Sequence, residues 1–571
     1  MRTWILLPLL VAPAGWLAAQ PPADPPPIVI TPRKPGDPVP PKDPPGVIVI
    51  RPKGQPAPAA VPVAPPAPVA PPAAAVPPAP AARADGKVLF DYWFVAAVEG
   101  ERIGYLQWTG TEVQKDGATL WVGRKYQSTT IARFGQLVTQ VGEESTVETP
   151  AGDVLVTSMR QGIGRDQALA LTGTVDGKTL KVKGEGGAAG AGDTPWPGGV
   201  TGLVTEPKLF KRKDLKAGDT FEYLTYVPQV NRVVKVTVAF DGAETTAFWP
   251  NTPPRKLARF VSNMGAVGGF KLPAATTWCD AESGEPLRVE FDFAGMGGRV
   301  TFLRTTEAAA KQPVTNPPDV FKVQSVRLDR DVPGIHSKAA VVYKVTLTGD
   351  DDPKTVFATD ARQELKSFDP KAKALELHVS AAHGPAKGAA VQPEPDKEFL
   401  ASNFFINWDN PPLKAHAAKA LAGLPADAPA WDKARAVESW VKQNMKAVEF
   451  SQAMATADNV ARTLSGDCTE YAMLGAAMCR AAGVPSRTVL GLVYAPAAGG
   501  KPFLAYHMWF EAFAGGQWVP LDGTLGQGGV GPGHVKITDH SWHDERTFAP
   551  LLPVMRVLAA RPGFAVVSVS P

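Results

Sequence analysis

The sequence predicts a multidomain α+β protein in which β-rich, sandwich-like domains precede a C-terminal domain of helices and strands. Its 571 residues exceed what one hydrophobic core usually serves, so about two or three domains are expected. Before residue 384, apolar residues alternate with polar ones and hairpin dipeptides recur. Beyond that point apolar residues repeat at helical spacing, so helices are expected there.

The composition is that of a globular protein with one unusual part. Hydrophobic residues make up 44% and charged residues 20%, whereas the 58 prolines are about twice ordinary usage and cluster near the N-terminus. The formal charge of +4 is small for this length, and Lys and Arg form no stripe interleaved with aromatics. Composition therefore gives no support for nucleic-acid binding, and no nucleic-acid partner is expected.

The first residues have the layout of a secretory signal peptide. Arg2 is followed by an apolar run from Trp4 to Leu17 and by the small residues Ala18 and Ala19. The alternative is an uncleaved membrane anchor, but the run is shorter than the roughly 20 residues that a span requires and contains two prolines. We expect cleavage near Ala19, no stable span afterwards, and a periplasmic, cell-envelope or secreted protein.

A Pro- and Ala-rich segment follows the signal region. It has too few large side chains to offset the entropy of ordering, which favours an extended, disordered chain. Such a tether could space the folded part from an envelope surface, or it could be a passive leader.

Two β regions come next. In the first, Asp116-Gly117, Asp176-Gly177 and Asp241-Gly242 are hairpin dipeptides, because a type I′ turn requires positive φ at both central positions. In the second, the run from Val341 to Gly349 alternates as a strand does. Neither region carries ligands at metal-binding spacing, and Asp350–Asp352 is interpreted as a solvated turn and not as a calcium loop.

A helix that begins with a cysteine is the first chemical signal in the C-terminal third. In SGDCTEYAMLGAAMCRAAGVPSR, Asp467 can cap a helix that starts at Cys468, and Glu470 completes a capping box. A thiol in the first turn feels the positive end of the helix dipole, which favours thiolate over thiol. The backbone N–H of Cys468 is also a candidate oxyanion donor, since amides at a helix start are unpaired.

The other two cysteines have a structural interpretation. Cys479 lies about 16 Å further along the same helix at 1.5 Å per residue, so it cannot form a disulfide with Cys468. It falls on the apolar stripe and is interpreted as a small buried hydrophobic residue. With Cys279, the count of three leaves at least one thiol outside any disulfide within a monomer.

A predicted hairpin brings a histidine and an aspartate together. In FLAYHMWFEAFAGGQWVPLDGT, a two-residue loop at Gly515-Gly516 would place Trp509 opposite Asp522. His507 then lies on the same face, diagonal to Asp522, with Cβ atoms within about 7 Å. A carboxylate that orients an imidazole, which in turn exchanges a proton with a thiol, is the arrangement that cysteine catalysis needs.

These segments resemble the transglutaminase-like superfamily. The resemblance rests on GDCTEYAMLGAAMCRAAGVPSR with Cys468, YHMWFEAF with His507 and GQWVPLDGT with Asp522, and it extends from about Phe399 to Phe548. It implies a papain-like core, in an exported bacterial-type member, with the nucleophile helix packed on an antiparallel sheet and Cys468, His507 and Asp522 as the triad. One departure is Tyr506, where such motifs commonly have glycine.

The resemblance implies a cysteine-dependent acyl-transfer enzyme acting on peptides or proteins. A thioester on Cys468 would be resolved by water, as in a peptidase or amidase, or by a primary amine, as in a transglutaminase. Trp509 and Trp518 could line the acyl-binding groove or could be packing residues. No cofactor is expected, although calcium, which some animal members use, is not excluded.

His534 and His540, in VGPGHVKITDHSW, are interpreted as structural. The alternative to an enzyme is a non-catalytic envelope scaffold whose β domains bind a partner. The expected boundaries are a signal peptide at 1–19, a disordered linker at 20–85, a β-rich domain at 86–310, a small β-sandwich-like domain at 318–383, a linker at 384–398, a catalytic domain at 399–550 and a C-terminal tail at 551–571.

Overall fold

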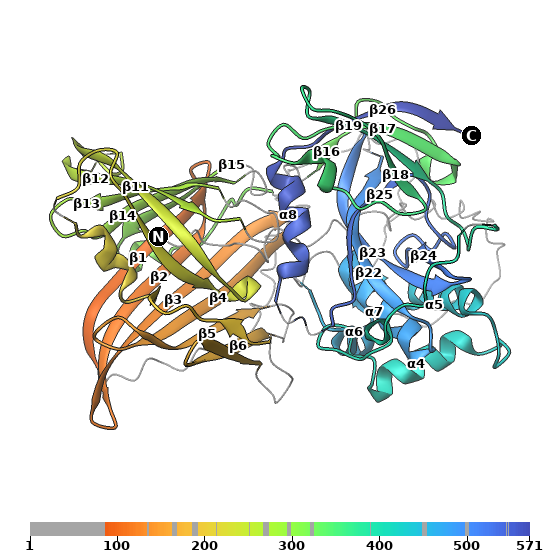
Figure 1. The fold of residues 1–571 in the computed structure, drawn as a ribbon, viewed down its shortest axis with the longest axis horizontal. Coiled ribbons are helices and arrows are strands. Elements are labelled where there is room, and N and C mark those ends of the chain that lie inside the picture. The colour runs from red at the N-terminus through yellow and green to blue at the C-terminus, as the bar shows by residue number, and fades with distance from the viewer. Residues whose placement is uncertain are drawn as a thin grey trace, which may run out of the picture. The chain divides into compact units, whose positions relative to one another are not determined.

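A computed structural model describes the chain from residue 86 to residue 571, with internal gaps at 134–135, 163–167, 185–191, 213, 251, 267–272, 294–297, 320–324, 389, 448–453, 497–501, 544 and 546. The expected signal peptide and Pro-rich linker lie outside the described residues. The described part is rich in strands and has few helices (Figure 1).

The first β region forms one continuous sheet of 15 strands, which we call the large sheet. Its order is β8-β7-β6-β5-β4-β3-β2-β1-β15-β14-β13-β12-β11-β10-β9, so nearly every strand pairs with its neighbour in sequence. Backbone hydrogen bonds therefore join all fifteen strands into one sheet in the region that was expected to form a sandwich-like domain. The strands are β1 (Lys87–Val98), β2 (Glu101–Lys115), β3 (Ala118–Arg133), β4 (Gln136–Glu148), β5 (Val154–Gly162), β6 (Ala168–Asp176), β7 (Thr179–Gly184), β8 (Thr194–Pro195), β9 (Val200–Thr201), β10 (Thr220–Val227), β11 (Arg232–Thr246), β12 (Arg255–Met264), β13 (Ala275–Asp280), β14 (Pro286–Phe293) and β15 (Gly298–Thr305).

Two of the three dipeptides in this sheet mark hairpins. Asp116 and Gly117 connect β2 to β3 with φ of 52° and 77°, and Asp176 pairs with Thr179 across the next such turn. The hairpin expected at Asp241-Gly242 is wrong. Those residues lie inside β11, where the pairing with β12 shifts between Phe240 and Gly242. Gly242 has φ of 114°, so its positive φ forms a β-bulge instead of a turn.

The second β region is a four-stranded sheet, which we call the small sheet. Its order is β18-β19-β17-β26, so its edge strand comes from the far end of the chain. The strands are β17 (Ala340–Thr346), β18 (Gln363–Asp369), β19 (Ala374–Ser380) and β26 (Gly563–Ser570). The expected C-terminal tail, 551–571, thus consists of helix α8 (Leu552–Ala559) and a strand that completes the small sheet.

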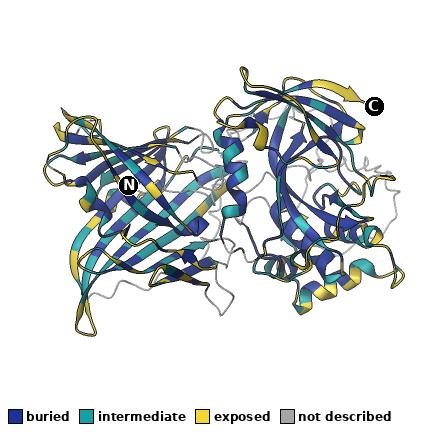
Figure 2. Cartoon of the chain, viewed as in Figure 1, coloured by how far each residue is buried: buried dark blue, intermediate teal, exposed yellow. Residues whose placement is uncertain are grey.

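The third sheet positions the candidate site and is called the catalytic sheet. Its order is β16-β23-β22-β25, with β24 paired to β23. Both long central strands are buried almost throughout (Figure 2). The strands are β16 (Val326–Arg327), β22 (Ser486–Ala495), β23 (Phe503–Ala514), β24 (Gln517–Leu521) and β25 (His534–His540).

Helices cover one face of the catalytic sheet, as Figure 1 shows. Helix α7 lies closest to β23: a Cβ on Gly475 would stand 2.4 Å from the ring of Phe510, so only glycine allows this approach. The helices are α4 (Pro411–Leu421), α5 (Ala430–Asn444), α6 (Ala457–Thr463) and α7 (Cys468–Ala481); α2 (Glu307–Ala310) follows the large sheet, and β20 (Lys446–Ala447) pairs with β21 (Ser465–Gly466).

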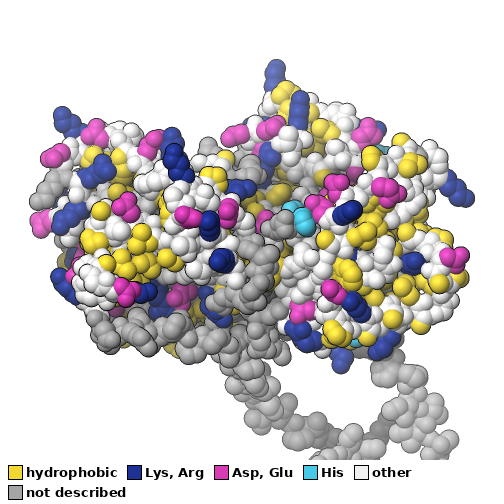
Figure 3. Space-filling model, turned by 60° about the horizontal axis from the view of Figure 1, so that its bottom comes forward, with side chains coloured by type: hydrophobic (Ala, Val, Ile, Leu, Met, Phe, Trp, Pro, Cys, Tyr) yellow, Lys and Arg dark blue, Asp and Glu magenta, His cyan; other side chains and the backbone are white. Residues whose placement is uncertain are grey.

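The surface carries charges of both signs. On the face drawn in Figure 3, Lys and Arg side chains are interspersed with Asp and Glu side chains over the described residues. In the part of the chain that the structure describes, the helices are all too short or too polar to cross a membrane.

Candidate active site

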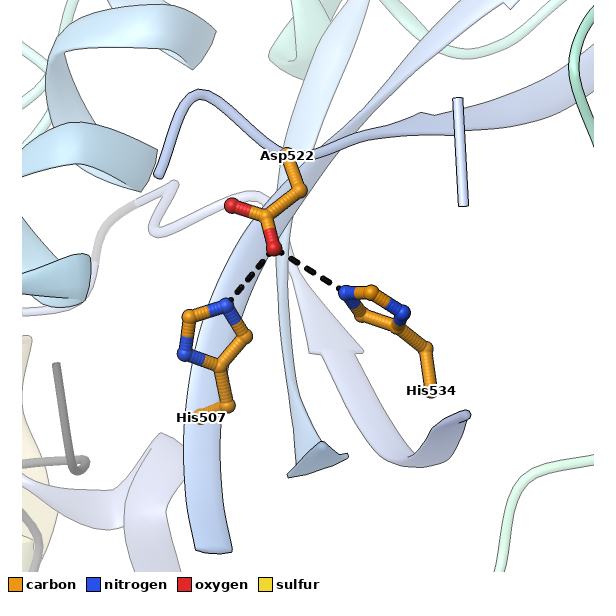
Figure 4. Close-up of side chains that lie close together, drawn as sticks. All are labelled: His507, Asp522 and His534. Atoms are coloured by element: carbon orange, nitrogen blue, oxygen red, sulfur yellow. Dashed lines mark hydrogen bonds and ion pairs between the residues drawn. The ribbon is translucent and has the colours of Figure 1, made fainter. Parts of the chain in front are cut away.

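The predicted hairpin forms with the predicted register. Gly515 and Gly516 have φ of 58° and 73°, and Ala514 pairs with Gln517 across them. Asp522 follows directly after β24, on the face that carries His507. The imidazole Nε2 of His507 donates to Oδ2 of Asp522 over 2.8 Å, and both side chains are only 1% exposed (Figure 4).

Hydrogen bonds hold the Asp522 carboxylate on every side. Its Oδ1 accepts the backbone N–H groups of Thr524 at 2.8 Å and Leu525 at 3.3 Å. Its own backbone N–H donates to the buried carboxyl of Glu438, on α5, over 3.1 Å. Burial by itself would raise the pKa of Asp522, but the two imidazoles on Oδ2 hold that pKa well below its usual range. The group is therefore an anion in the folded protein.

The second of those imidazoles belongs to His534, which was expected from the sequence to be a structural residue. Its Nε2 donates to the same Oδ2 atom over 3.0 Å, opposite His507 (Figure 4). Burial lowers the pKa of His534 to about 3, so this ring is neutral. His534 begins β25, which pairs with β22, and that strand order could not be read from the sequence.

Helix α7 begins at Cys468, as predicted. The Asp467 side chain accepts the N–H of Thr469 at 2.9 Å, and Glu470 accepts the N–H of Asp467 at 2.9 Å, which completes the capping box. Burial and the Asp467 charge raise the pKa of Glu470 well above its usual range. Cys468 is buried, and none of the three cysteines is in a disulfide. The thiol therefore occupies the first turn of a firmly capped helix.

The first turn of α7 lies beside the segment that carries Asp522. A Cβ on Gly523 would stand 3.8 Å from the ring of Tyr471, which is one helical turn after Cys468. His507 meanwhile keeps one polar atom available: its buried Nδ1 has no hydrogen-bond partner among the described residues. The structure thus joins His507 to Asp522, and it places Tyr471, one turn into α7, near Gly523.

The two tryptophans differ in position. Trp509 is 1% exposed and packs against Val489 and Val530, with its ring stacked near His507. Trp518 is half-buried under the guanidinium of Arg487, 4.2 Å from its ring centroid, and lines a cavity of about 530 Å³. Trp518 thus borders open space, but Cys468, His507 and Asp522 do not line that cavity.

The remaining residues singled out from sequence have structural contacts. Nδ1 of His540 accepts the N–H of Trp542 over 2.8 Å, and burial lowers its pKa. Asp350 is buried and forms two 2.8 Å contacts with Arg556, so it is an ion-paired residue and not a solvated one.

One group of side chains has the composition of a metal site. The ligand atoms of His507, Asp522 and His534 all lie within 4.8 Å of one another. Two imidazoles and a carboxylate suit zinc or another first-row metal, whereas calcium prefers oxygen ligands. The two distances to Oδ2, 2.8 and 3.0 Å, are also those of ordinary hydrogen bonds.

A protein-family model matches part of the chain that includes most of this site. The model of the transglutaminase-like superfamily matches residues 415–523, which include Cys468, His507 and Asp522 but not His534. No curated protein sequence matches the chain. Two solved structures are similar in part. One, described as "a Putative Cysteine Protease from Cytophaga hutchinsonii", has 17% identity and a TM-score of 0.25, over 36% of this chain and 81% of its own.

The other, described as "a Putative Protease from Parabacteroides distasonis", has 12% identity and a TM-score of 0.17, over 67% of this chain and 64% of its own. The family model alone identifies residues 415–523 as a transglutaminase-like domain. That domain supports a cysteine-dependent enzyme in general.

Proposed function

We propose that this protein is an exported enzyme, periplasmic, envelope-bound or secreted, that cleaves or exchanges amide bonds of peptides or proteins through a thioester on Cys468. The observation that carries the proposal is the contact between His507 and Asp522, which leaves the ring atom Nδ1 of His507 without a partner among the described residues. A buried imidazole that is oriented at one nitrogen and open at the other is a candidate general base.

In the proposed reaction the thiol of Cys468 gives its proton to Nδ1 of His507, and the helix dipole stabilises the resulting thiolate. The sulfur attacks the amide carbonyl and the C–S bond forms. His507 returns the proton to the amine nitrogen as the C–N bond breaks. The backbone N–H of Cys468 faces the developing oxyanion. The Asp522 anion stabilises the imidazolium that exists between these two proton transfers.

The second half of the reaction decides the kind of enzyme. Water or a primary amine attacks the thioester carbonyl and loses its proton to His507 while the C–S bond breaks. Water yields a carboxylate, which is peptidase or amidase chemistry, and an amine yields a new amide, which is transglutaminase chemistry. We favour an extracytoplasmic peptide or protein as the acyl donor, because residues 1–19 have the layout of an export signal.

The test compares the mature protein with its Cys468→Ala variant. Both are incubated with a glutamine-containing protein and a labelled primary amine, and peptide cleavage and label incorporation are followed together. We expect the variant to lose both reactions by at least about a thousandfold. Cys479→Ala is the matched control, because this thiol is buried on the same helix among apolar residues. Equal activity of parent and Cys468→Ala would remove the proposal.

A second measurement separates the enzyme from the scaffold alternative. Iodoacetamide near neutral pH is expected to alkylate Cys468 before the other cysteines, because burial raises the pKa of Cys279 to about 12 and also raises that of Cys479. Peptide mass spectrometry after short exposure reads the order of labelling. If Cys468 stays unmodified while the native fold persists, the scaffold interpretation gains.

A further inference from the structure

One carboxylate oxygen in the site serves two imidazoles. His507 and His534 both donate to Oδ2 of Asp522, at 2.8 and 3.0 Å, from strands on opposite sides of β22. His534 lies beyond residues 415–523, so the resemblance to the family does not account for it. Its side chain is fully buried. A polar group so deeply buried, and bonded to the member of the triad that orients the base, needs an explanation.

A glycine on the strand between them lets the two rings meet. Gly491, on β22, pairs with His507 on β23 and with Lys536 on β25. A Cβ at Gly491 would stand 2.5 Å from the ring of Trp509 and 2.2 Å from the carbonyl of Val535. Any other residue at 491 would push these neighbours apart, so side chains from β23 and β25 reach each other only across glycine.

The small sheet holds the strand that carries His534. Arg362 donates to the carbonyl of His534 over 2.8 Å. The side-chain amide of Gln363 takes both backbone groups of Lys536: Oε1 accepts its N–H at 2.7 Å and Nε2 donates to its carbonyl at 2.6 Å. Gln363 thereby replaces a missing neighbouring strand. We call the segment from Asp360 to Gln363 the clamp.

An ion pair closes the clamp from the other side. The ammonium of Lys536, only 1% exposed, lies 3.2 Å from the carboxylate of Asp360 and 2.9 Å from that of Glu511 on β23. The clamp therefore fixes β25 against β23 as well as against the small sheet. The ring of His336 completes the enclosure, with its centroid 5.3 Å from that of His534.

We infer that His534 is a positioning residue that fixes the Asp522 carboxylate for His507, and that the small sheet, through the clamp, is an integral part of the active site. The inference rests on the proposed function. It makes a module outside the matched domain necessary for the chemistry.

The chemical role follows from the charge of each ring. A neutral His534 donates its Nε2 proton to Oδ2 without adding a positive charge, so it holds the carboxylate in place while leaving its charge for the imidazolium of His507. Without this donor, the carboxylate could rotate or accept a water, and the His507 ring would lose its fixed orientation.

The experiment uses the full mature chain and three substitutions at one position. His534→Gln keeps an N–H donor at similar reach, His534→Phe fills the space without a donor, and His534→Asn has the same amide one carbon shorter. We expect kcat to fall about 10- to 100-fold in the Phe and Asn variants with KM within about twofold, and the Gln variant to keep kcat within about fivefold. If His534→Phe does not fold, His534→Asn carries the comparison with His534→Gln.

A double-mutant cycle tests the clamp. Gln363→Leu alone is expected to lower kcat, but to add little in the His534→Phe background, because both act on the same carboxylate. A structural role would lower stability additively in both backgrounds and would leave kcat of the folded fraction unchanged. If the folded His534→Phe and His534→Asn variants keep the parental kcat and KM, this inference fails and the proposed function stands. If the Cys468→Ala variant keeps the parental turnover, the proposed function and this inference fail together.

Discussion

Two regions of this protein bury polar clusters of similar size, and they use them differently. In the large sheet, the carboxylate of Glu148 is fully buried and accepts the N–H groups of Val204 at 2.7 Å and Thr205 at 3.0 Å. Beside it, Lys125 and Glu206 form an ion pair of 3.0 Å with side chains 1% exposed. In these groups each charge is matched by a partner that belongs to the fold.

The region around the catalytic sheet buries His507, Asp522 and His534 just as deeply. There, however, Nδ1 of His507 and Nδ1 of His534 have no hydrogen-bond partner within the described residues. Burial without a partner costs free energy, and the large sheet also contains such atoms, for example the hydroxyls of Thr225 and Ser262. What sets this cluster apart is an open ring nitrogen on a histidine that a buried carboxylate orients, which is the combination that general-base chemistry uses.

We call His507, Asp522 and His534 the open cluster, because two of its ring nitrogens have no partner among the described residues. The largest effect should come from changing its carboxylate, Asp522. Asp522→Asn keeps the shape but removes the charge that stabilises imidazolium and fixes its tautomer. We expect kcat to fall about 10³- to 10⁴-fold with little change in KM. Asp409→Asn is the control, because that side chain is 65% exposed. Parental kcat in Asp522→Asn would make the two clusters alike, both structural.

We call Lys125, Glu148 and Glu206 of the large sheet the closed cluster. The next largest effect should come from this cluster, and it should be on the free energy of unfolding. Lys125→Met leaves Glu206 buried without its cation, so we expect the free energy of unfolding to fall by about 3–5 kcal/mol. Lys181→Met, which removes an exposed ion pair with Asp176, should leave the free energy of unfolding nearly unchanged. Urea unfolding measures both. Turnover by folded Lys125→Met should equal that of the parent, and a selective loss of kcat would break the contrast.

The open cluster was predicted as far as local sequence rules reach. Two glycines set the register that joins His507 to Asp522, and an aspartate cap places Cys468 at a helix start; both follow from neighbouring residues. His534 was missed because its role depends on the order of strands, with β25 beside β22, and on the absence of a side chain at Gly491. Neither is a property of a short segment.

The fold shows the same division between local and distant information. The hairpin at Asp116-Gly117 was predicted, whereas Asp241-Gly242 forms a bulge, because the partner strand decides between turn and bulge. The pairing of β26 with β17 joins residues more than 200 positions apart, and no pattern within either strand announces it. Local sequence patterns therefore predict most strands and helices, whereas the contact of His534 with Asp522 depends on the pairing of distant strands.

A smaller effect should appear at Glu438, which touches the open cluster through the backbone of Asp522. Burial and the Asp522 charge raise the pKa of Glu438 to about 7 in the folded protein, from a usual 4.5. Its contribution to stability is thus fully present below about pH 4.5 and is lost as pH rises through 7. Glu438→Gln stays neutral, so relative to the parent it should gain up to about 3 kcal/mol over this window.

Urea unfolding of parent and variant at several pH values between 4.5 and 8 measures that difference. Glu394→Gln is the control, because this glutamate is exposed. A constant difference between parent and Glu438→Gln across the window would show that the carboxyl is ionised throughout. The open cluster would then hold two adjacent buried anions, Glu438 and Asp522.

The smallest effect should be that of chelation, and it sharpens what the open cluster is. Because His507 and His534 already donate to Asp522, the proposed chemistry needs no metal, and EDTA should change kcat/KM by less than about twofold. Added Zn²⁺ should inhibit, since the same three atoms can bind it once both protons are lost. His534→Phe removes one ligand and should weaken that inhibition about 10- to 100-fold. If EDTA instead abolishes activity and Zn²⁺ restores it, the cluster is a metal centre. The Nδ1 atoms of His507 and His534, partnerless among the described residues, would then belong to metal ligands, and Nδ1 of His507 would not be the atom that accepts the thiol proton.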